Sequence, residues 1–413
     1  MPCFLGLYRM KTSADNFQRP QFEVSDIFRL YGKEYRSHNG MTKKQHAVMS
    51  AIENCRTSDC GFHVDQCNRC GYTETDFNSC RDRHCPKCQG ISRKKWVKKR
   101  LKEVLPVAYF HAVFTLPHLL HSFILYNKKL IYDLLFSSSS ETLLTFGRDP
   151  KWLGGEIGFY GILHSWGQTL WHHPHVHFIV PGGALTDDGR WIEPKYKDKF
   201  LFPVHALSKV FRGKFIEDLK SAYYCGDVEL PPDLADLSRP DNFESWIDDL
   251  VGRDWIVYCK PPFGNAEEVI RYIGRYTHRV AISNQRIVRV ENDEVDFRYK
   301  DYKANTIVWQ TTTLKAQEFI RRFLWHVLPK GFHKIRHYGF LANGRCKAKV
   351  AQIRMLLGAE SIENDCSMDD DFRIECPECG KGKLYPILII NRFTRIISDF
   401  VSFHKIEYAF DTS

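Results

Sequence analysis

Two histidines, two tyrosines and a run of cysteines are the residues whose types and spacing could do chemistry in this chain. His175 and His177 stand two apart in the run HHPHVHFIV, which has the pattern of a β-strand. In a strand, both imidazoles would project from one face while Val176 and Phe178 project from the other, so the pair could bind one metal ion. A histidine pair in a strand also occurs without any metal, and the neighbouring residues decide between the two interpretations.

Tyr272 and Tyr276 stand four apart in VIRYIGRYTH, a segment that predicts a helix with both phenol groups on one face. Two such tyrosines could simply cover a core. Gly274 argues against that alternative, because glycine is a poor helix former. Positive charge around the pair would suit a phosphate backbone, and it comes from Arg271, Arg275 and Arg279.

A tyrosine must be activated before it can act as a nucleophile, because a hydroxyl with a pKa of about 10 is a weak nucleophile at neutral pH. A metal ion can make a phosphate electrophilic and stabilise a 3′ leaving oxygen, and a histidine pair with one further ligand could hold that ion. A covalent phosphotyrosine would store the energy of the broken phosphodiester, so rejoining would need no nucleotide cofactor. The lack of a Walker-type glycine loop agrees with this.

Seven of the fourteen cysteines fall between Cys55 and Cys88, which in a reducing compartment favours metal binding over disulfides. Two C-x-x-C pairs separated by fourteen residues predict one tetrahedral zinc site, with Cys67, Cys70, Cys85 and Cys88 as ligands. A second zinc has a mixed candidate set in the same segment, namely Cys55, His63, Cys80 and His84.

A further pair, Cys376 and Cys379, is half of a zinc ribbon near the C-terminus. Cys346 and Cys366 could complete it, although their spacing is loose.

Bound zinc is expected to stabilise this segment, which is a small fold with too little hydrophobic core of its own. Basic residues within and after it predict that this module docks on DNA; they are Arg81, Arg83, Lys87, Arg93, Lys94 and Lys98. The alternatives are a protein-interaction module and, for the basic helix that follows Cys88, a merely solvated surface.

Composition agrees with a nucleic-acid partner. The 413 residues are 43% hydrophobic, and 59 basic against 49 acidic side chains leave a net charge of +10. Such a chain should fold as two or three units and favour a polyanion over an acidic metabolite. With neither a secretory signal nor a long apolar run, we expect a cytoplasmic protein that joins the nucleoid when bound to DNA, with no membrane partner.

Periodicity predicts helices over 22–54, with a capping box at Thr42 and Gln45, and a basic helix after Cys88. Strands are predicted at 109–117, over GEIGFYGIL and HPHVHFIVPG, around Trp255 and over RVAIS (279–283). Ser138 with Glu141 could cap a helix, while 226–244 should be an irregular, loop-rich excursion. The boundaries suggest three parts: a helical and zinc-binding DNA-docking domain (1–102), a catalytic domain (103–345) and a C-terminal segment (346–413).

Several of these segments resemble the two-tyrosine HUH transposases of the insertion-sequence-ninety-one type, which move by a rolling-circle route. The resemblance covers most of the chain from Phe22 to Cys379. The segments that match are EVSDIFRLYG, CGFHVDQCNRCGYTETDFNSCRDRHCPKCQG, HAVFTLP, GILHSWGQTLWHHPHVHFIVPGGAL, VIRYIGRYTHRVAISN and LPKGFHKIRHYGFLAN.

The resemblance implies an α+β fold with an HUH-nuclease-like antiparallel sheet, helices on its faces, and the tyrosine helix against the histidine strand. It implies that His175 and His177 are metal ligands and that Tyr272 and Tyr276 are the nucleophiles. The product would be a 5′-phosphotyrosine on single-stranded DNA at the ends of a mobile element, with Mg²⁺ or Mn²⁺ as the catalytic ion and zinc as the structural one. Candidates for a third catalytic ligand are Gln168, His172, Glu267 and His278.

Two other functions fit the same residues. A replication initiator or conjugative relaxase would share the histidines and a tyrosine but act at a plasmid origin. A non-catalytic zinc DNA-binding protein would use the histidine and tyrosine pairs only for packing.

Overall fold

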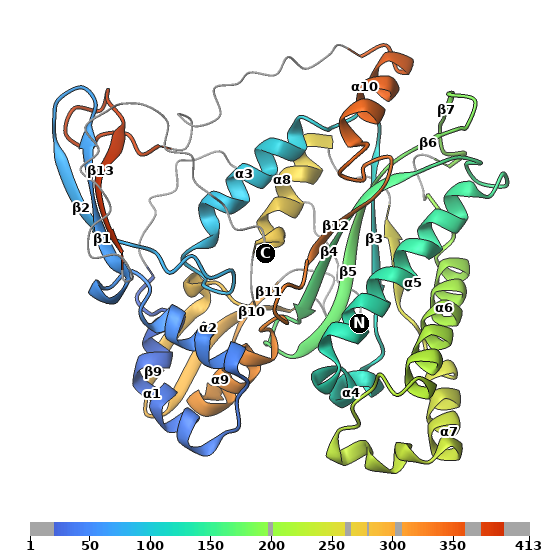
Figure 1. Ribbon diagram of the computed structural model, residues 1–413, viewed down its shortest axis with the longest axis horizontal. Helices are drawn as coiled ribbons and strands as arrows, with labels where there is room; N and C mark the ends of the chain where they lie inside the picture. Colours follow the sequence, from blue (N-terminus) through green and yellow to red (C-terminus); the bar gives the residue numbers. More distant parts are fainter. Residues whose placement is uncertain are drawn as a thin grey trace.

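The computed structural model describes residues 20–196, 201–260, 266–278, 281–301, 308–359 and 373–391 (Figure 1). Inside the helix Ala266–Thr277 it leaves out the side chains at positions 266, 272, 273, 275 and 276. Helices and antiparallel sheets mix along the whole of this part, which confirms the α+β fold class.

A five-stranded antiparallel sheet lies at the centre, with the strand order β12-β4-β5-β3-β8. Strands β4 and β5 form a hairpin in which His164 stands opposite His175, and β3 pairs with the other side of β5. The bounds are β3 (Tyr109–Thr115), β4 (Gly158–Trp166), β5 (His172–Pro181), β8 (Val257–Lys260) and β12 (Ile335–Gly339).

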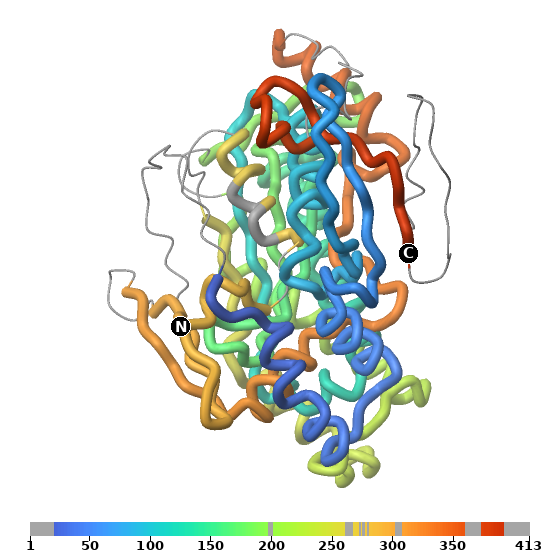
Figure 2. Tube along the Cα trace, turned by 90° about the vertical axis from the view of Figure 1, so that its left-hand side faces the viewer, coloured from blue at the N-terminus to red at the C-terminus, as the bar shows by residue number. Residues whose placement is uncertain are grey.

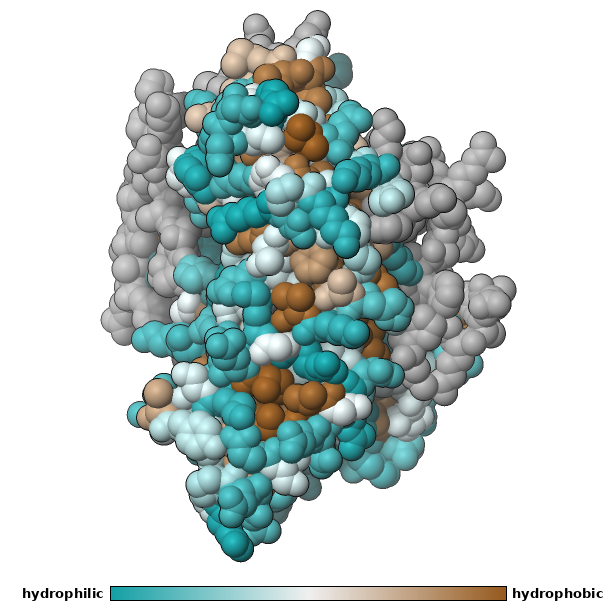
Figure 3. All heavy atoms as spheres, turned by 90° about the vertical axis from the view of Figure 1, so that its right-hand side faces the viewer, coloured by the Kyte–Doolittle hydropathy of each residue, from teal (hydrophilic) through white to brown (hydrophobic). Residues whose placement is uncertain are grey.

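One face of this sheet builds the main core. Alternate residues such as Phe114, Val176 and Phe178 are fully buried on it. Helices cover this face in Figure 1, and Figure 3 shows that the side of the molecule beyond them is mostly hydrophilic with small separate apolar patches. The covering elements are η2 (His118–Leu120), α4 (His121–Tyr126), α5 (Lys128–Arg148), α6 (Val204–Tyr224), η3 (Pro232–Ser238) and α7 (Pro240–Val251).

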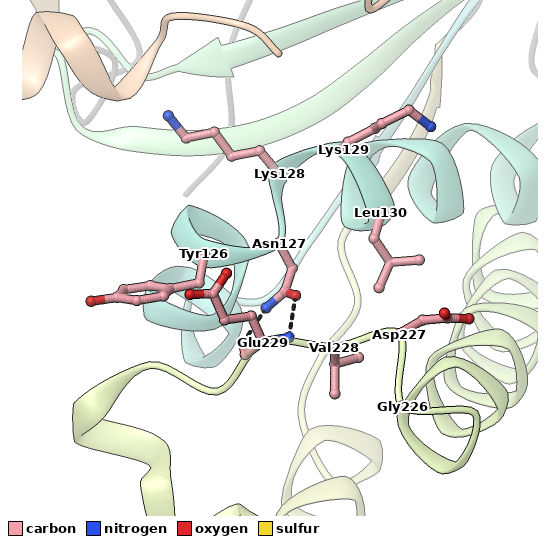
Figure 4. Close-up of a pocket in the computed structure, with 9 residues that line it drawn as sticks. All are labelled: Tyr126, Asn127, Lys128, Lys129, Leu130, Gly226, Asp227, Val228 and Glu229. Atoms are coloured by element: carbon pink, nitrogen blue, oxygen red, sulfur yellow. Dashed lines mark hydrogen bonds between the residues drawn. The ribbon is translucent and has the colours of Figure 1, made fainter. Parts of the chain in front are cut away.

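An open hollow of about 420 Å³ lies where α4 meets α5 and the chain leaves α6 (Figure 4). The Asn127 amide bonds the backbone of Glu229 twice, donating to its carbonyl oxygen at 2.7 Å and accepting from its N–H at 2.8 Å. Lys128 and Lys129 extend away from this pair of bonds (Figure 4). At this hollow, the two hydrogen bonds therefore hold the polar segment after α6 against the helical layer.

The opposite face of the sheet carries α3 (Gln89–Leu101), α8 (Ala266–Thr277) and α10 (Cys346–Leu356). Val269 and Ile270 of α8 share one buried cluster with the sheet residues Tyr160, Ile162 and Ile179. In Figure 1, α3 and α8 run side by side along this face. The sheet is thus the middle layer between two helical layers.

A second unit packs the N-terminal helices on α9 and a small sheet. Its core joins Val24, Phe28 and Ile52 to Phe319 and Phe323. The sheet order is β11-β10-β9. The elements are α1 (Val24–His38), α2 (Lys43–Glu53), η4 (Asn284–Arg286), β9 (Ile287–Glu291), β10 (Glu294–Asp301), β11 (Val308–Lys315) and α9 (Ala316–Trp325).

A third sheet has the order β13-β1-β2 and joins distant parts of the sequence. In it, Gly61 pairs with Asn391 and Cys67 with Leu384. Figure 2 shows the red C-terminal strand running beside the light-blue hairpin. The bounds are η1 (Ser58–Cys60), β1 (Gly61–Cys67), β2 (Thr73–Phe77) and β13 (Leu384–Asn391), while the short strands β6 (Ala184–Leu185) and β7 (Trp191–Ile192) form a separate pair.

Most predicted elements are confirmed, including the capping box in which Gln45 N–H donates to the Thr42 hydroxyl. The expected helix cap at Ser138 is wrong, because Ser138 lies inside α5 and donates to the Leu134 carbonyl. The segment 226–244 is more regular than expected, since it holds η3 and the start of α7. Of RVAIS, residues 281–283 are not a strand and 279–280 lie outside the description.

Among the described residues, no helix combines the length and the hydrophobicity needed to cross a membrane.

Candidate metal centres and the tyrosine helix

Three histidines from two adjacent strands converge on the face of the central sheet that also carries α8. His175 and His177 come from β5 and His164 comes from β4. One ring nitrogen from each lies within 4.8 Å of the others. We call these three residues the histidine centre.

Strand alternation explains the placement of the pair. Val176 and Phe178 enter the aromatic core on the other face with no exposed surface, so His175 and His177 must turn the opposite way. The hairpin register then sets His164 directly opposite His175. The expectation that the two imidazoles share a face is confirmed.

Hydrogen bonds leave ring nitrogens available for a metal ion. His175 Nδ1 donates to the carbonyl oxygen of His173 at 2.7 Å, so its Nε2 keeps a lone pair. A 2.7 Å bond joins His177 Nδ1 to His111 Nε2. His177 Nε2 is buried and has no hydrogen-bond partner among the described residues.

Burial keeps these rings neutral at physiological pH. It lowers the pKa of His175 to about 4 and the pKa of His177 well below its usual value, the latter with help from the nearby His164. His111, behind them, has its pKa lowered to about 4 by burial and by Lys260. Neutral imidazoles held by second partners are the form that binds a divalent cation, so His175 and His177 fit one.

None of the four residues suggested as a third ligand belongs to this group. His172 faces the other side of the sheet and bonds the Tyr132 hydroxyl at 2.8 Å, while His278 bonds the Thr277 hydroxyl at 2.8 Å. Gln168 accepts from the backbone of residue 300 at 3.4 Å, and Glu267 lies in an exposed ion pair with Arg271 at 3.7 Å. The third histidine of the group is His164, which the sequence analysis did not name.

His164 could have been noticed from the alternation of GFYGILHSW, where it shares a strand face with Tyr160 and Ile162. The sequence does not, however, state the register between β4 and β5, so it could not show that His164 faces His175. His111 in YFHAVFT was missed for the same reason.

Helix α8 lies on the sheet face that bears the histidine centre. Its Gly274 packs closely against α3, because a Cβ atom there would lie 2.2 Å from Val97 Cγ2. At its end, burial together with Lys334 and Arg93 lowers the pKa of His278 to about 4. The Lys334 carbonyl accepts from the N–H of Leu163, the neighbour of His164, so the end of α8 approaches the histidine end of β4.

The backbone of Tyr272, Arg275 and Tyr276 belongs to α8, but their side chains lie outside the description. Arg279 lies outside the described residues altogether. The meeting of the phenol groups with the histidines therefore stays a prediction. Gly274, by contrast, has a packing reason of its own.

The cysteines form two groups of four, and neither is the group that the spacing suggested. Cys55, Cys80, Cys85 and Cys88 make one, and Cys67, Cys70, Cys376 and Cys379 make the other, with the sulfur atoms of each group within 4.8 Å of one another. The two C-x-x-C pairs expected to share one zinc are thus separated.

The hairpin geometry explains this regrouping. Cys67 ends β1 and Cys70 lies in the turn before β2, so both sit at the tip of the hairpin. Seven residues of strand span about 23 Å, which carries this pair away from Cys55 and Cys85 at the base. Each four-sulfur group has the composition of a structural zinc site.

Thiolate formation at the hairpin tip is favoured at Cys379. Backbone N–H groups of residues 381 and 382 lower the pKa of Cys379 to about 6, and the Gly382 N–H lies 3.3 Å from its sulfur. The Arg69 N–H makes the equivalent 3.4 Å contact to Cys67. Cys346, once a suggested partner, is buried in α10 outside both groups, and Cys366 lies outside the description.

His63 and His84, expected in a second zinc site, belong to neither group. His84 is fully buried between the Asp82 carboxylate and the backbone N–H of Leu328, which occupy its two ring nitrogens. His63 Nδ1 bonds Asn78 Oδ1 at 2.9 Å. Both histidines therefore serve the packing of the zinc segment.

The basic residues expected on DNA divide into two kinds. Arg83 donates to the carbonyls of Phe332 and Pro329, and Lys87 donates to Glu23 at 2.7 Å, so these two hold the fold together. Exposed or partly exposed cations remain at Arg81, Arg93, Lys94, Lys98 and Arg271.

Beside α3, an open hollow of about 580 Å³ adds further positive charge. None of its lining residues is acidic; they are Trp96, Lys99, Arg100, His333, Ile335, Arg336, His337 and Asn343. Arg100 is paired with Glu103 at 3.0 Å and Arg336 is paired with Asp133, so the exposed Lys99 is the cation of this hollow that can attract a polyanion.

Two four-cysteine groups, a sheet that presents three histidines and a basic helix define the class, which is a zinc-binding α+β protein suited to nucleic acid. Residues 27–116 match the family described as "Transposase zinc-binding domain", and residues 158–349 match the family described as "Putative transposase". No solved structure matches the chain.

Two curated relatives agree with these matches. The "Putative transposase y4qJ" of Sinorhizobium fredii (strain NBRC 101917 / NGR234) is 45% identical over 90% of this chain and 96% of its own length. The "Transposase for insertion sequence element IS801" of Pseudomonas savastanoi pv. phaseolicola is 28% identical over 71% of this chain and 69% of its own length. The chain belongs to the transposases of the insertion-sequence-ninety-one type, and it contains their zinc-binding domain.

Proposed function

We propose that this transposase nicks and rejoins single-stranded DNA at the ends of a mobile element through a 5′-phosphotyrosine. Tyr272 and Tyr276 are the proposed nucleophiles, and the histidine centre is the proposed site of a Mg²⁺ or Mn²⁺ ion. The observation that supports this best is the convergence of His164, His175 and His177 on the sheet face beneath α8.

Helix geometry supports the role of the tyrosines. Positions 272 and 276 stand two residues on either side of Gly274, which is about 200° around the helix from it. Gly274 faces α3, so both tyrosine positions belong to the side of α8 turned away from α3. Val269, which is buried against the sheet, lies within about 60° of both tyrosine positions around the helix, so this side of α8 adjoins the sheet.

In the proposed reaction, a tyrosine oxygen attacks a phosphorus atom of the DNA backbone. The bond from tyrosine oxygen to phosphorus forms, the bond from phosphorus to the 3′ oxygen breaks, and the tyrosine proton ends on that 3′ oxygen. A bound divalent ion would supply Lewis-acid polarisation of the phosphate and stabilise the leaving oxygen. Attack by another 3′ hydroxyl reverses the exchange, and the second tyrosine allows a second strand to be held during rolling-circle transposition.

The substrate would reach this site over basic surface. Arg93 and Lys94 of α3 are exposed beside α8, and the basic hollow continues past the edge strand β12. Such a surface favours the phosphate backbone of single-stranded DNA. Work on the DNA of a cell would place the protein in the cytoplasm at the nucleoid.

The test is a covalent-adduct assay on denaturing gels. Purified protein is incubated with Mn²⁺ and a labelled single strand that contains an end of its element. We expect an adduct that persists with either Tyr272→Phe or Tyr276→Phe, disappears with both, and falls at least 100-fold with His175→Ala. Tyr224→Phe, an exposed tyrosine on α6, is the matched control. An adduct that survives the double variant would contradict the proposal.

Failure to form any adduct, together with retained DNA binding, would favour a non-catalytic zinc DNA-binding protein. An initiator or relaxase would instead form the adduct on a plasmid-origin strand and not on the element end.

A further inference from the structure

A group of aromatic and cationic side chains lies where β5 begins, outside the histidine centre. Trp171 precedes β5, Trp325 ends α9 and His121 begins α4. The rings of Trp171 and His121 stack with centroids 5.3 Å apart, and Trp325 stands perpendicular to Trp171 at 5.5 Å. We call these three residues, with Arg321 and Arg322, the indole cluster.

Trp171 keeps 39% of its surface exposed although it is firmly held. The residue before it, Leu170, has the left-handed φ of 62° and a fully buried side chain. Its carbonyl accepts from His326 Nε2 at 3.1 Å, and the Thr169 carbonyl accepts from Arg322 at 3.2 Å. Trp171 is therefore exposed on an ordered turn. The unfavourable backbone conformation of Leu170 in this turn is maintained by the hydrogen bonds from its neighbours.

Guanidinium groups give the cluster a positive charge. Arg321 lies 4.4 Å from the Trp325 ring centroid, and Arg322 lies 5.1 Å from that of Trp171. Glu318 bonds both arginines at 2.6 to 2.8 Å and so balances one of the two charges. An exposed indole beside a remaining cation suits a ligand that has both a flat ring and a negative charge.

A nucleotide with an unpaired base is such a ligand, because its base can stack on an aromatic ring while its phosphate meets the cation. Bases within a duplex stack on each other and offer no free face. Trp171 stands four strand residues from His175, or about 13 Å, which is a distance of a few nucleotides. Along the way, the His173 ring lies 5.2 Å from that of His175.

We propose that the indole cluster binds an unpaired base of the DNA strand a few nucleotides from the phosphate at the histidine centre. The proposal rests on the function proposed above and adds a subsite for single strands. Trp171 supplies the stacking surface, and Arg322 supplies the charge.

The experiment compares two probes that have the same number of phosphates. One is a labelled dT12 strand and the other is a 12-mer of abasic deoxyribose phosphates. We expect the unaltered protein to bind dT12 more tightly. Trp171→Ala should weaken dT12 binding about 5- to 100-fold, the range for loss of one stacked base, and leave the abasic strand unchanged. Trp171→Phe should keep most of the affinity.

Tyr224→Ala removes an exposed aromatic residue from the end of α6, outside the indole cluster, and should change neither probe. Zinc content and Tm equal to those of the unaltered protein show that Trp171→Ala is folded. Equal loss for both probes, or no loss for either, would overturn the subsite.

The adduct assay separates this proposal from the one on which it rests. A tyrosine-dependent adduct with no effect of Trp171 would reject the subsite alone. A Trp171-dependent preference for dT12 without any adduct would reject the nuclease alone.

Discussion

One missing Cβ atom sets how closely α3 and α8 pack. We expect Gly274→Ala to lower the free energy of unfolding by about 1–3 kcal/mol, because the added methyl group would overlap Val97. The better helix propensity of alanine, about 1 kcal/mol, offsets only part of this. Adding Val97→Ala should restore most of the stability in urea unfolding. A Gly274→Ala protein more stable than the original would show that the crossing is loose.

Lys128 at the start of α5 is partly buried, and that burial lowers its pKa to about 8. Below pH 8, folded and unfolded chains are both protonated, so the full penalty of burying the charge is present. Between pH 8 and about 10.4, only the unfolded chain keeps the proton, and the folded state gains stability as the pH rises.

Lys128→Met removes that penalty. It should therefore stabilise the protein most at pH 7, by about 1–3 kcal/mol, and hardly at all by pH 10.5. Unfolding measured at both pH values checks this. Lys129→Met is the control, because Lys129 is exposed and paired with Asp133 at 3.0 Å. An effect of Lys128→Met that does not vary with pH would count against the lowered pKa.

At the scale of elements, each four-cysteine group ties together segments that could not hold a metal alone. Cys376→Ser should reduce the bound zinc from two ions per chain to one, and Cys85→Ser should do the same at the other group. Metal analysis of purified protein gives the numbers, with Cys225→Ser, an exposed cysteine outside both groups, as control. If the 67, 70, 85 and 88 pairing were right, Cys376→Ser would leave the zinc content unchanged.

The local sequence pattern was enough to predict most helices and strands, and to predict that His175 and His177 share one face of their strand. The alternation in β5 and the capping box at Thr42 depend on residues only a few positions apart, so both can be predicted from a single sequence. The basic helix after Cys88 is legible in the same way.

What could not be predicted depends on contacts between distant residues. His164 joins the centre only through the register of two strands, and Cys376 meets Cys70 across 306 positions. The spacing of the two C-x-x-C pairs was misleading, because a hairpin of ordinary length lies between them and separates them in space.

At the scale of the whole molecule, a net charge of +10 is useful only where it faces the substrate. Binding of dT12 should weaken with salt, and Lys94→Ala should reduce the slope of log K against log salt concentration by about 0.7, the value for one phosphate of a single strand. Lys87→Ala should leave the slope unchanged because its charge is engaged with Glu23. Equal slopes for the original protein and Lys94→Ala would place the DNA elsewhere.

The pairing of β13 with β1 also has a consequence for synthesis. The N-terminal hairpin leaves the ribosome about 300 residues before the strand and the two thiols that complete it. Until translation reaches residue 379, only Cys67 and Cys70 of the four sulfur ligands in this group have been made. A copy of the gene shortened by decay of its 3′ end would therefore yield a protein with its tyrosine helix intact and its zinc hairpin unfinished.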